Sequence, residues 1–271
     1  MDHDHTLGET VDALELYAQQ KRELGAPGVD RLVHEAREAL DRTIDRLRAL
    51  PENPELRARE PDDLAAIRAL RPGGRRRLQR ATPEDEYRER LAGAFLGRCA
   101  GCILGAPVEG WSVDRMEERA ATIGDAFPPV DYWSEVPNPT AVRYLRSPAS
   151  AYTSGRMRGV PVDDDLSYTV LGLLILEECG PDFSVEDVGR AWLRYLPFAC
   201  TAEDVALANL EIGVPATEAG ATGGVWATER AVHMGNPHRT HAEPVDNPYL
   251  QWIGADIRAD PWGYVAPGWP E

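Results

Sequence analysis

Three consecutive carboxylates, Asp163, Asp164 and Asp165, stand directly before a long apolar run that ends near Glu178. Like charges at this spacing repel one another unless something relieves the repulsion. A helix N-terminus relieves part of it, because its unpaired N–H groups and its dipole favour anions. A divalent cation relieves more, and hard cations such as Mg²⁺ prefer carboxylate oxygens. The triplet therefore indicates either a metal site or a helix cap.

The capping interpretation is the more common one for such a segment, since Asp is among the preferred residues at helix N-termini. Consecutive residues inside a helix do not face one another, so three adjacent ligands converge only where a loop passes into a helix. The triplet occupies such a position, between Pro161 and the apolar run. On the residues alone, both interpretations stay open.

The cysteines and histidines add no complete ligand set. Four cysteines in 271 residues do not form the pattern of a disulfide framework, which favours a reducing cytoplasm. Cys99 and Cys102 make a C-x-x-C, but a second pair at zinc spacing is missing and the surrounding sequence is typical of a small-residue helix. The six histidines include no H-E-x-x-H. We therefore expect no zinc or redox role for the cysteine pair.

Charge and hydropathy exclude several partners. A net charge of −16 opposes nucleic-acid binding, which needs basic side chains to displace counterions. We find no apolar run long enough to span a bilayer, and the first residues have neither the positive nor the apolar region of a secretory signal. We therefore expect a cytoplasmic protein that binds neither nucleic acid nor membrane.

Helical spacing dominates the sequence, and β alternation is scarce. Residues 1 to about 50 predict two amphipathic helices separated near Gly25–Gly28, serving as a packing appendage or a dimerisation pair. A further short helix is expected just after Pro61. Residues 185–195, which begin with a Ser184-x-x-Asp187 capping pattern, and residues 202–213 predict two more. Residues 112–160 are expected to form an irregular lid or binding loop.

A charged helix is expected to begin at Glu84 and to become rich in glycine and alanine. Glycines at 93, 97, 101 and 105 share one helix face, which predicts tight packing in a helical core. Glu109 follows in a turn of proline and glycine, where a carboxylate can face a cleft.

Three blocks, in this order, resemble the ADP-ribosylglycohydrolase family. They are Gly93–Gly110, the segment Asp163-Asp-Asp-Leu-Ser-Tyr168, and Gly254–Asp260 with Gly263 and Tyr264. The resemblance covers about residues 85–271 and implies an all-α, multi-helix fold around a cleft with two Mg²⁺ ions. It also implies hydrolysis of the bond that links ADP-ribose to an acceptor. The implied partner is ADP-ribose, either as a small molecule or attached to a protein. We accordingly divide the chain into an N-terminal helical extension, residues 1–83, and a partial family domain, residues 84–271.

The resemblance implies roles for particular residues. Asp163, Asp164 and Asp165 match the first metal-binding element, and Asp164 also matches a catalytic carboxylate. Glu109 matches a glutamate that closes over the site and assists acid–base chemistry. Gly254 and Arg258 match positions that contact the substrate phosphates or ribose.

Two substitutions and one missing element depart from the family pattern. Cys102 stands where many members have Asp, and Asp163 replaces the usual Thr. The family continues to a second carboxylate element that completes the metal pair, and we find only the first. We therefore expect a domain incomplete at its C-terminus, which a partner chain could complete by supplying the missing helices. The alternatives are an inactive, truncated or split homologue that binds ADP-ribose or a partner chain, and a helical interaction protein with no metal site.

Overall fold

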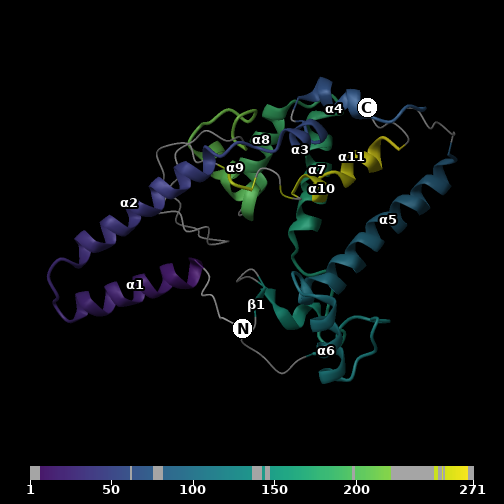
Figure 1. Cartoon of the computed structure of the whole chain (residues 1–271). Coiled ribbons are helices and arrows are strands. Elements are labelled where there is room, and N and C mark those ends of the chain that lie inside the picture. The colour runs from purple at the N-terminus through teal and green to yellow at the C-terminus, as the bar shows by residue number, and fades with distance from the viewer. Residues whose placement is uncertain are drawn as a thin grey trace. The chain divides into compact units, whose positions relative to one another are not determined.

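The computed structural model describes residues 7–61, 63–75, 82–135, 142–143, 147–196, 199–220, 247–249, 252 and 254–267 (Figure 1). These form two compact units, residues 1–74 and residues 75–271. Helices dominate both, and the strands of the described chain are the antiparallel pair β1 (Val142–Arg143) and β2 (Ser147–Pro148). The expected all-α fold class is confirmed.

The first unit contains two long helices and two short ones. Helices α1 (Leu7–Glu23) and α2 (Val29–Arg48) pack against each other on either side of a turn with Gly25 and Gly28 at positive φ, as the sequence predicts. The expected short helix after Pro61 is α4 (Leu64–Leu70), capped by the side chain of Asp63. Helix α3 (Pro54–Arg59) was not predicted. Asn53 caps its first turn, and Pro54 stands at a helix start, where no N–H donor is needed.

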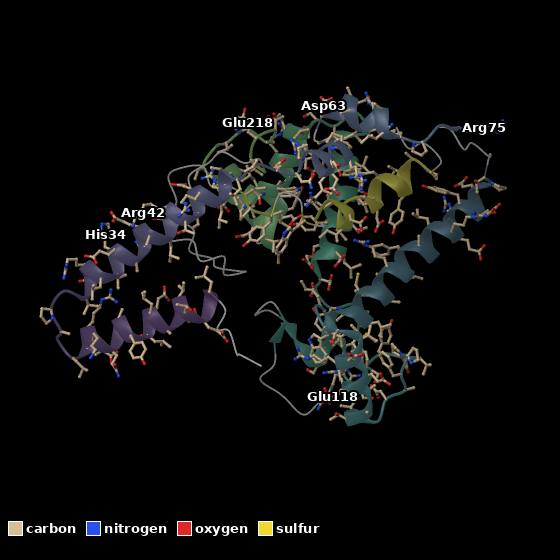
Figure 2. The ribbon with its side chains drawn as sticks, in the orientation of Figure 1. His34, Arg42, Asp63, Arg75, Glu118 and Glu218 are labelled. Carbon is tan, nitrogen blue, oxygen red and sulfur yellow. The ribbon has the colours of Figure 1, made fainter. Side chains whose placement is uncertain are left out.

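Charged side chains cover the outer surface of α2, including the labelled His34 and Arg42 (Figure 2). Glu38 lies 3.3 Å from His34 Nε2 and 3.6 Å from Arg42 Nη1. All three side chains are more than half exposed, and such ion pairs contribute little to stability. These surface pairs therefore add little to the hairpin, in which Ala18 of α1 is buried.

The second unit carries the residues that the sequence singled out. Its helices are α5 (Glu84–Gly105), the 3₁₀ turn η1 (Ala106–Val108), α6 (Val113–Ile123), the 3₁₀ turn η2 (Ala149–Tyr152), α7 (Asp164–Cys179), α8 (Val185–Tyr195), α9 (Thr201–Glu211), α10 (Gly254–Ile257) and α11 (Asp260–Val265). Helix α7 packs against α5, α8, α10 and α11, and α9 packs against α8 (Figure 1). The main core lies where α7, α8 and α9 meet, around Tyr168, Leu171, Ile175 and Trp192.

Capping residues mark the start of α8, which the sequence predicts, and of α6, where no helix was expected. At α8 the Ser184 hydroxyl accepts from Asp187 N–H while the Asp187 carboxylate accepts from Ser184, which confirms the predicted capping box. The expectation of an irregular segment over 112–160 is wrong at α6. There the Ser112 hydroxyl accepts from the N–H of Arg115 at 3.3 Å, and Gly124 ends the helix at φ 80°.

The predicted tight packing around the glycines of α5 is also wrong. A Cβ atom added at position 93, 97, 101 or 105 would meet no atom of the described chain within 4 Å. Instead, α5 buries Cys99 and Ile103 and turns Arg98 towards α7 and α11, so the glycine face is not its packing face. Close packing is found at Gly172 of α7, where an added Cβ would lie 2.8 Å from the Pro261 Cβ.

Replacing Gly172 by alanine is therefore expected to lower the free energy of unfolding by about 1–3 kcal/mol, because the new methyl group overpacks against Pro261. Gly97→Ala is the matched control, since it meets no described atom and raises helix propensity by about 1 kcal/mol. Urea unfolding followed by tryptophan fluorescence measures both. Equal effects of the two substitutions would contradict the close contact between α7 and α11.

By length and composition alone, the helix Glu84–Val108 could cross a membrane, which corrects the expectation that no run is long enough. The core helix of a folded domain passes the same test. Arg98, in the middle of this helix, donates hydrogen bonds to the carbonyls of Asp165 and Ile257, both at 2.9 Å. These bonds tie the helix to α7 and α10 within the second unit.

Candidate metal and substrate site

Asp163 begins the site as the N-cap of α7. Its backbone is extended (φ −146°, ψ 143°), and its carboxylate accepts a hydrogen bond from Asp165 N–H at 3.1 Å. Its carbonyl accepts from the Ser167 N–H at 3.0 Å and from the Ser167 hydroxyl at 2.7 Å. The capping interpretation is thus confirmed for Asp163. Only 3% of this residue is exposed, so a carboxyl group is held inside the unit at the start of the helix.

Neighbouring side chains hold this helix start in place. Tyr152, which is 1% exposed, donates its hydroxyl hydrogen to the carbonyl of Val162, next to the cap. Arg98 Nη2 donates to the carbonyl of Asp165 at 2.9 Å and lies 3.6 Å from its carboxylate. Arg98 also forms an ion pair with Asp260, at the start of α11. Parts of the chain far apart in sequence therefore fix the position of the acidic triplet.

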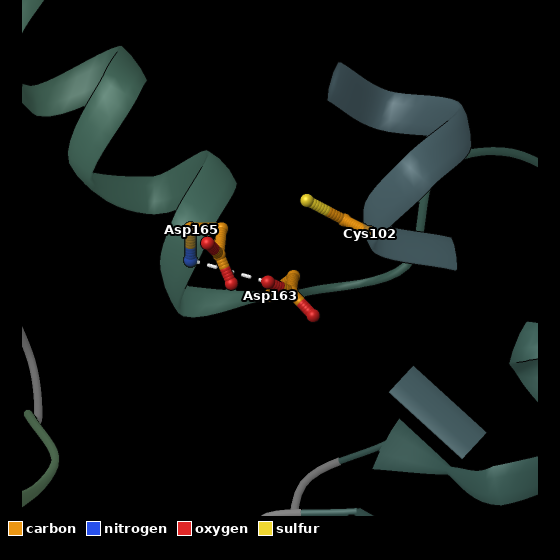
Figure 3. Close-up of side chains that lie close together, drawn as sticks. All are labelled: Cys102, Asp163 and Asp165. Atoms are coloured by element: carbon orange, nitrogen blue, oxygen red, sulfur yellow. Dashed lines mark hydrogen bonds between the residues drawn. The ribbon is translucent and has the colours of Figure 1, made fainter. Parts of the chain in front are cut away.

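The structure adds Cys102 to the site. Its thiol points from α5 towards Asp163 and Asp165, and one ligand atom from each of the three residues lies within 4.8 Å of the others (Figure 3). Burial, and then the nearby Asp163 and Asp165, raise the pKa of the Cys102 thiol to about 11. No role at the site was predicted for Cys102. The signal that could have found it was its place in the family pattern, where many members have Asp.

This donor group fits the implied Mg²⁺ only in part. The two carboxylates are ligands that a hard cation prefers, and their convergence supports a metal site. A thiol is a poor ligand for Mg²⁺ and a good one for softer cations. The donor group therefore suits a divalent cation, but its thiol does not favour Mg²⁺ in particular.

Asp164 is not part of this donor group, but it lines a cavity of about 490 Å³ together with Asp163. Most of the lining is apolar, from α5, α7 and the connection between α8 and α9, and it includes Tyr168 and Cys200. Burial raises the pKa of Tyr168 far above its usual value, so its phenol keeps its proton at neutral pH. A largely apolar cavity with a few polar groups at one side is typical of small-molecule sites.

Gly254 and Arg258 lie together beside Glu203 of α9. Arg258 pairs with Glu203, which is only 4% exposed, and a Cβ at Gly254 would overlap the Glu203 carboxylate. The guanidinium also lies 5.8 Å from the ring centre of Tyr168 and 5.6 Å from that of Trp192. Arg258 lines a second cavity, of about 330 Å³, whereas its neighbour Tyr168 lines the cavity of Asp164.

Glu109 is exposed and directly follows η1. It lines neither of these two cavities and is not part of the group formed by Cys102, Asp163 and Asp165. The described residues therefore bring Asp163, Asp164 and Asp165 to one helix start and place Gly254 with Arg258, while Glu109 stands apart. Its catalytic role stays a prediction.

An all-α unit that gathers carboxylates and a thiol beside an apolar cavity has the features of a metal-binding enzyme domain. Comparison with protein families makes the class specific, because the model of the ADP-ribosylglycohydrolase family matches residues 83–267. The chain belongs to this family, whose members are hydrolases that bind metal ions and act on ADP-ribosylated substrates. No curated protein and no solved structure matched the chain.

Proposed function

We propose that this protein hydrolyses the glycosidic bond between ADP-ribose and an acceptor, using a divalent cation held at the start of α7. The observation that carries the proposal is the convergence of Asp163 and Asp165 within 4.8 Å of a third donor, directly beside the cavity that Asp164 lines. Family membership supplies the reaction class. The resemblance implies Mg²⁺, and the two carboxylates are suitable ligands for it.

The chemistry requires a positioned water and stabilisation of positive charge, because glycoside hydrolysis passes through an oxocarbenium-like transition state. Asp164, which lines the cavity, would accept a proton from the attacking water. Asp163 and Asp165 would hold the cation, and their orientation is fixed by the capping hydrogen bond and by Arg98. When bound, a divalent cation orients ribose hydroxyls and acidifies water. The resemblance also gives Glu109 a part in acid–base chemistry, and from its exposed position after η1 it would have to close over the cavity to take it.

The proposed substrate is ADP-ribose, free or linked to protein. The 490 Å³ cavity falls in the range of about 300–1,000 Å³ that small-molecule pockets occupy. Arg258, whose side chain is 32% exposed, would bring a guanidinium to the phosphates from the neighbouring cavity. Gly254 would leave room for Glu203 and Arg258 beside that cavity, since any side chain at this position would collide with Glu203.

Release of ADP-ribose from modified protein tests the proposal. Asp164→Ala is expected to lower the rate by about 100-fold or more, the usual contribution of a general base. Asp165→Ala is expected to abolish cation-dependent binding of ADP-ribose, and both variants should keep nearly the same helicity by circular dichroism. Asp182→Ala removes an exposed carboxylate just beyond α7 and serves as the control. Wild-type rates in both site variants would remove these residues from the mechanism.

A second candidate function is binding without hydrolysis, to ADP-ribose or to a partner chain. It is favoured by α7, whose Leu173 is 50% exposed outside the cavity, although a helix that is apolar on all sides is normally buried. A partner chain that covers this face would satisfy that expectation. Tight binding of ADP-ribose with no release from modified protein would favour this candidate over the hydrolase.

A further inference from the structure

We infer that Cys102, Asp163 and Asp165 together bind a thiophilic divalent cation, with Zn²⁺ preferred over the Mg²⁺ that the resemblance implies. The inference rests on the metal-binding part of the proposed function. It concerns which cation this chain selects and gives Cys102 the role of a metal ligand.

The geometry brings the three donors together from two separate elements. Cys102 lies in the C-terminal half of α5, and the carboxylates stand at the N-terminus of α7 (Figure 3). Their ligand atoms all lie within 4.8 Å of one another. Donors around a tetrahedral zinc ion lie roughly 3.5 Å apart, given Zn–S and Zn–O bonds of about 2.3 and 2.1 Å. Side-chain rotations that shorten the separations by roughly 1 Å would therefore close the site.

The kind of donor decides the preference. Mg²⁺ requires near-octahedral oxygen ligands, so a sulfur in the site occupies space without contributing a useful bond. Zn²⁺ accepts thiolate and carboxylate together and needs only four ligands. Cys102, Asp163 and Asp165 would supply three, which leaves the fourth position for water. Three protein ligands and one water are the usual composition of a catalytic zinc site.

The competing interpretation is that Arg98 already neutralises the acidic groups. Arg98 lies 3.6 Å from Asp165, but the same guanidinium forms an ion pair with Asp260 and donates to two carbonyls. One positive charge is thus shared between Asp165 and Asp260. A divalent cation held by Asp163 and Asp165 would bring further positive charge to this helix start.

Absorption spectroscopy with Co²⁺ as a zinc substitute tests the inference on the metal-free full-length chain, with the thiols kept reduced by a phosphine. Cobalt bonded to a thiolate has a charge-transfer band in the near ultraviolet that oxygen and imidazole ligands do not produce. The histidines of the chain therefore cannot mimic the signal. We expect the wild-type chain to show this band, and Cys102→Ser to lose it. Cys179→Ser removes an exposed thiol and is expected to keep the band.

Calorimetric titrations with Zn²⁺ and with Mg²⁺ give the second measurement. Cys102→Ser is expected to weaken Zn²⁺ binding by at least about tenfold, because losing even an outer partner of a ligand costs about 10–100-fold. Cys102→Asp, which supplies a hard oxygen donor instead, is expected to strengthen Mg²⁺ binding and weaken Zn²⁺ binding. Tryptophan fluorescence confirms that each variant is folded.

The outcomes separate this inference from the proposed function. A wild-type chain that binds Mg²⁺ more tightly than Zn²⁺, with no thiolate band, overturns the inference and leaves a carboxylate metal site intact. A band that survives in Cys102→Ser also overturns it. A chain that binds none of these cations overturns both the inference and the metal-dependent hydrolysis.

Discussion

Arg258→Met is expected to destabilise the second unit by about 3–5 kcal/mol, because it leaves the Glu203 carboxylate buried without its guanidinium. Glu203 is only 4% exposed, so water cannot replace the lost partner. Methionine has no guanidinium, so the substitution also removes the contacts of that group with the rings of Tyr168 and Trp192. An effect of this size is a large share of the stability of a typical domain, about 5–15 kcal/mol.

Urea unfolding followed by tryptophan fluorescence measures this effect, and all seven tryptophans of the sequence lie between residues 111 and 269. The matched control is Arg156→Met, which breaks the exposed pair with Glu135 and is expected to leave stability nearly unchanged. Adding Glu203→Gln to Arg258→Met should restore part of the stability, because the buried charge is then gone. A double variant as unstable as Arg258→Met would show that the buried charge is not the cause.

Arg98→Met is expected to lower the free energy of unfolding by about 3 kcal/mol. The side chain is 15% exposed, pairs with Asp260 and donates to the carbonyls of Asp165 and Ile257. Its removal leaves these acceptors without their charged donor and loosens α7 and α11 from α5. Both carboxylate partners are 36% exposed, so solvent offsets part of the loss and keeps it below that of a fully buried pair.

Arg88→Met is the matched control for Arg98→Met, because it lies on the same helix and breaks an exposed pair with Glu84 at 2.7 Å. Its expected cost is below about 0.5 kcal/mol, as for other pairs one helical turn apart. The same fluorescence measurement follows both. If Arg98→Met is as mild as Arg88→Met, Arg98 does not join the three helices.

Local sequence signals predicted the helices whose ends are marked by capping residues. The Ser184 and Asp187 pattern placed the start of α8 correctly, and Gly25–Gly28 correctly separated α1 from α2. The same kind of signal was overlooked at α6, where Ser112 and Gly124 stand among many prolines and aromatic residues. The glycine spacing of α5 led to a wrong prediction of tight packing. Such spacing shows which residues share a helix face, but not which face meets a neighbouring helix.

The candidate site was predictable only where it is local in sequence. The three adjacent aspartates correctly predicted the start of α7. In the structure Asp163 caps the helix, Asp164 lines the cavity, and Asp163 and Asp165 belong to the donor group. Cys102 reaches this group by the packing of α5 on α7, and Arg98 joins Asp260 across 162 residues. Contacts of that kind are set by tertiary packing, and a single sequence carries no pattern that predicts them.

The most direct test of the account is calorimetric titration of ADP-ribose into the full-length chain, with Zn²⁺ or Mg²⁺ in turn and with a chelator. If a cation at Asp163 and Asp165 helps to hold the sugar, at least one cation should strengthen ADP-ribose binding by about tenfold or more, within the usual range of coupling between sites. Asp165→Ala should remove that coupling. Equal affinity for ADP-ribose with each cation and with the chelator would contradict the proposed site.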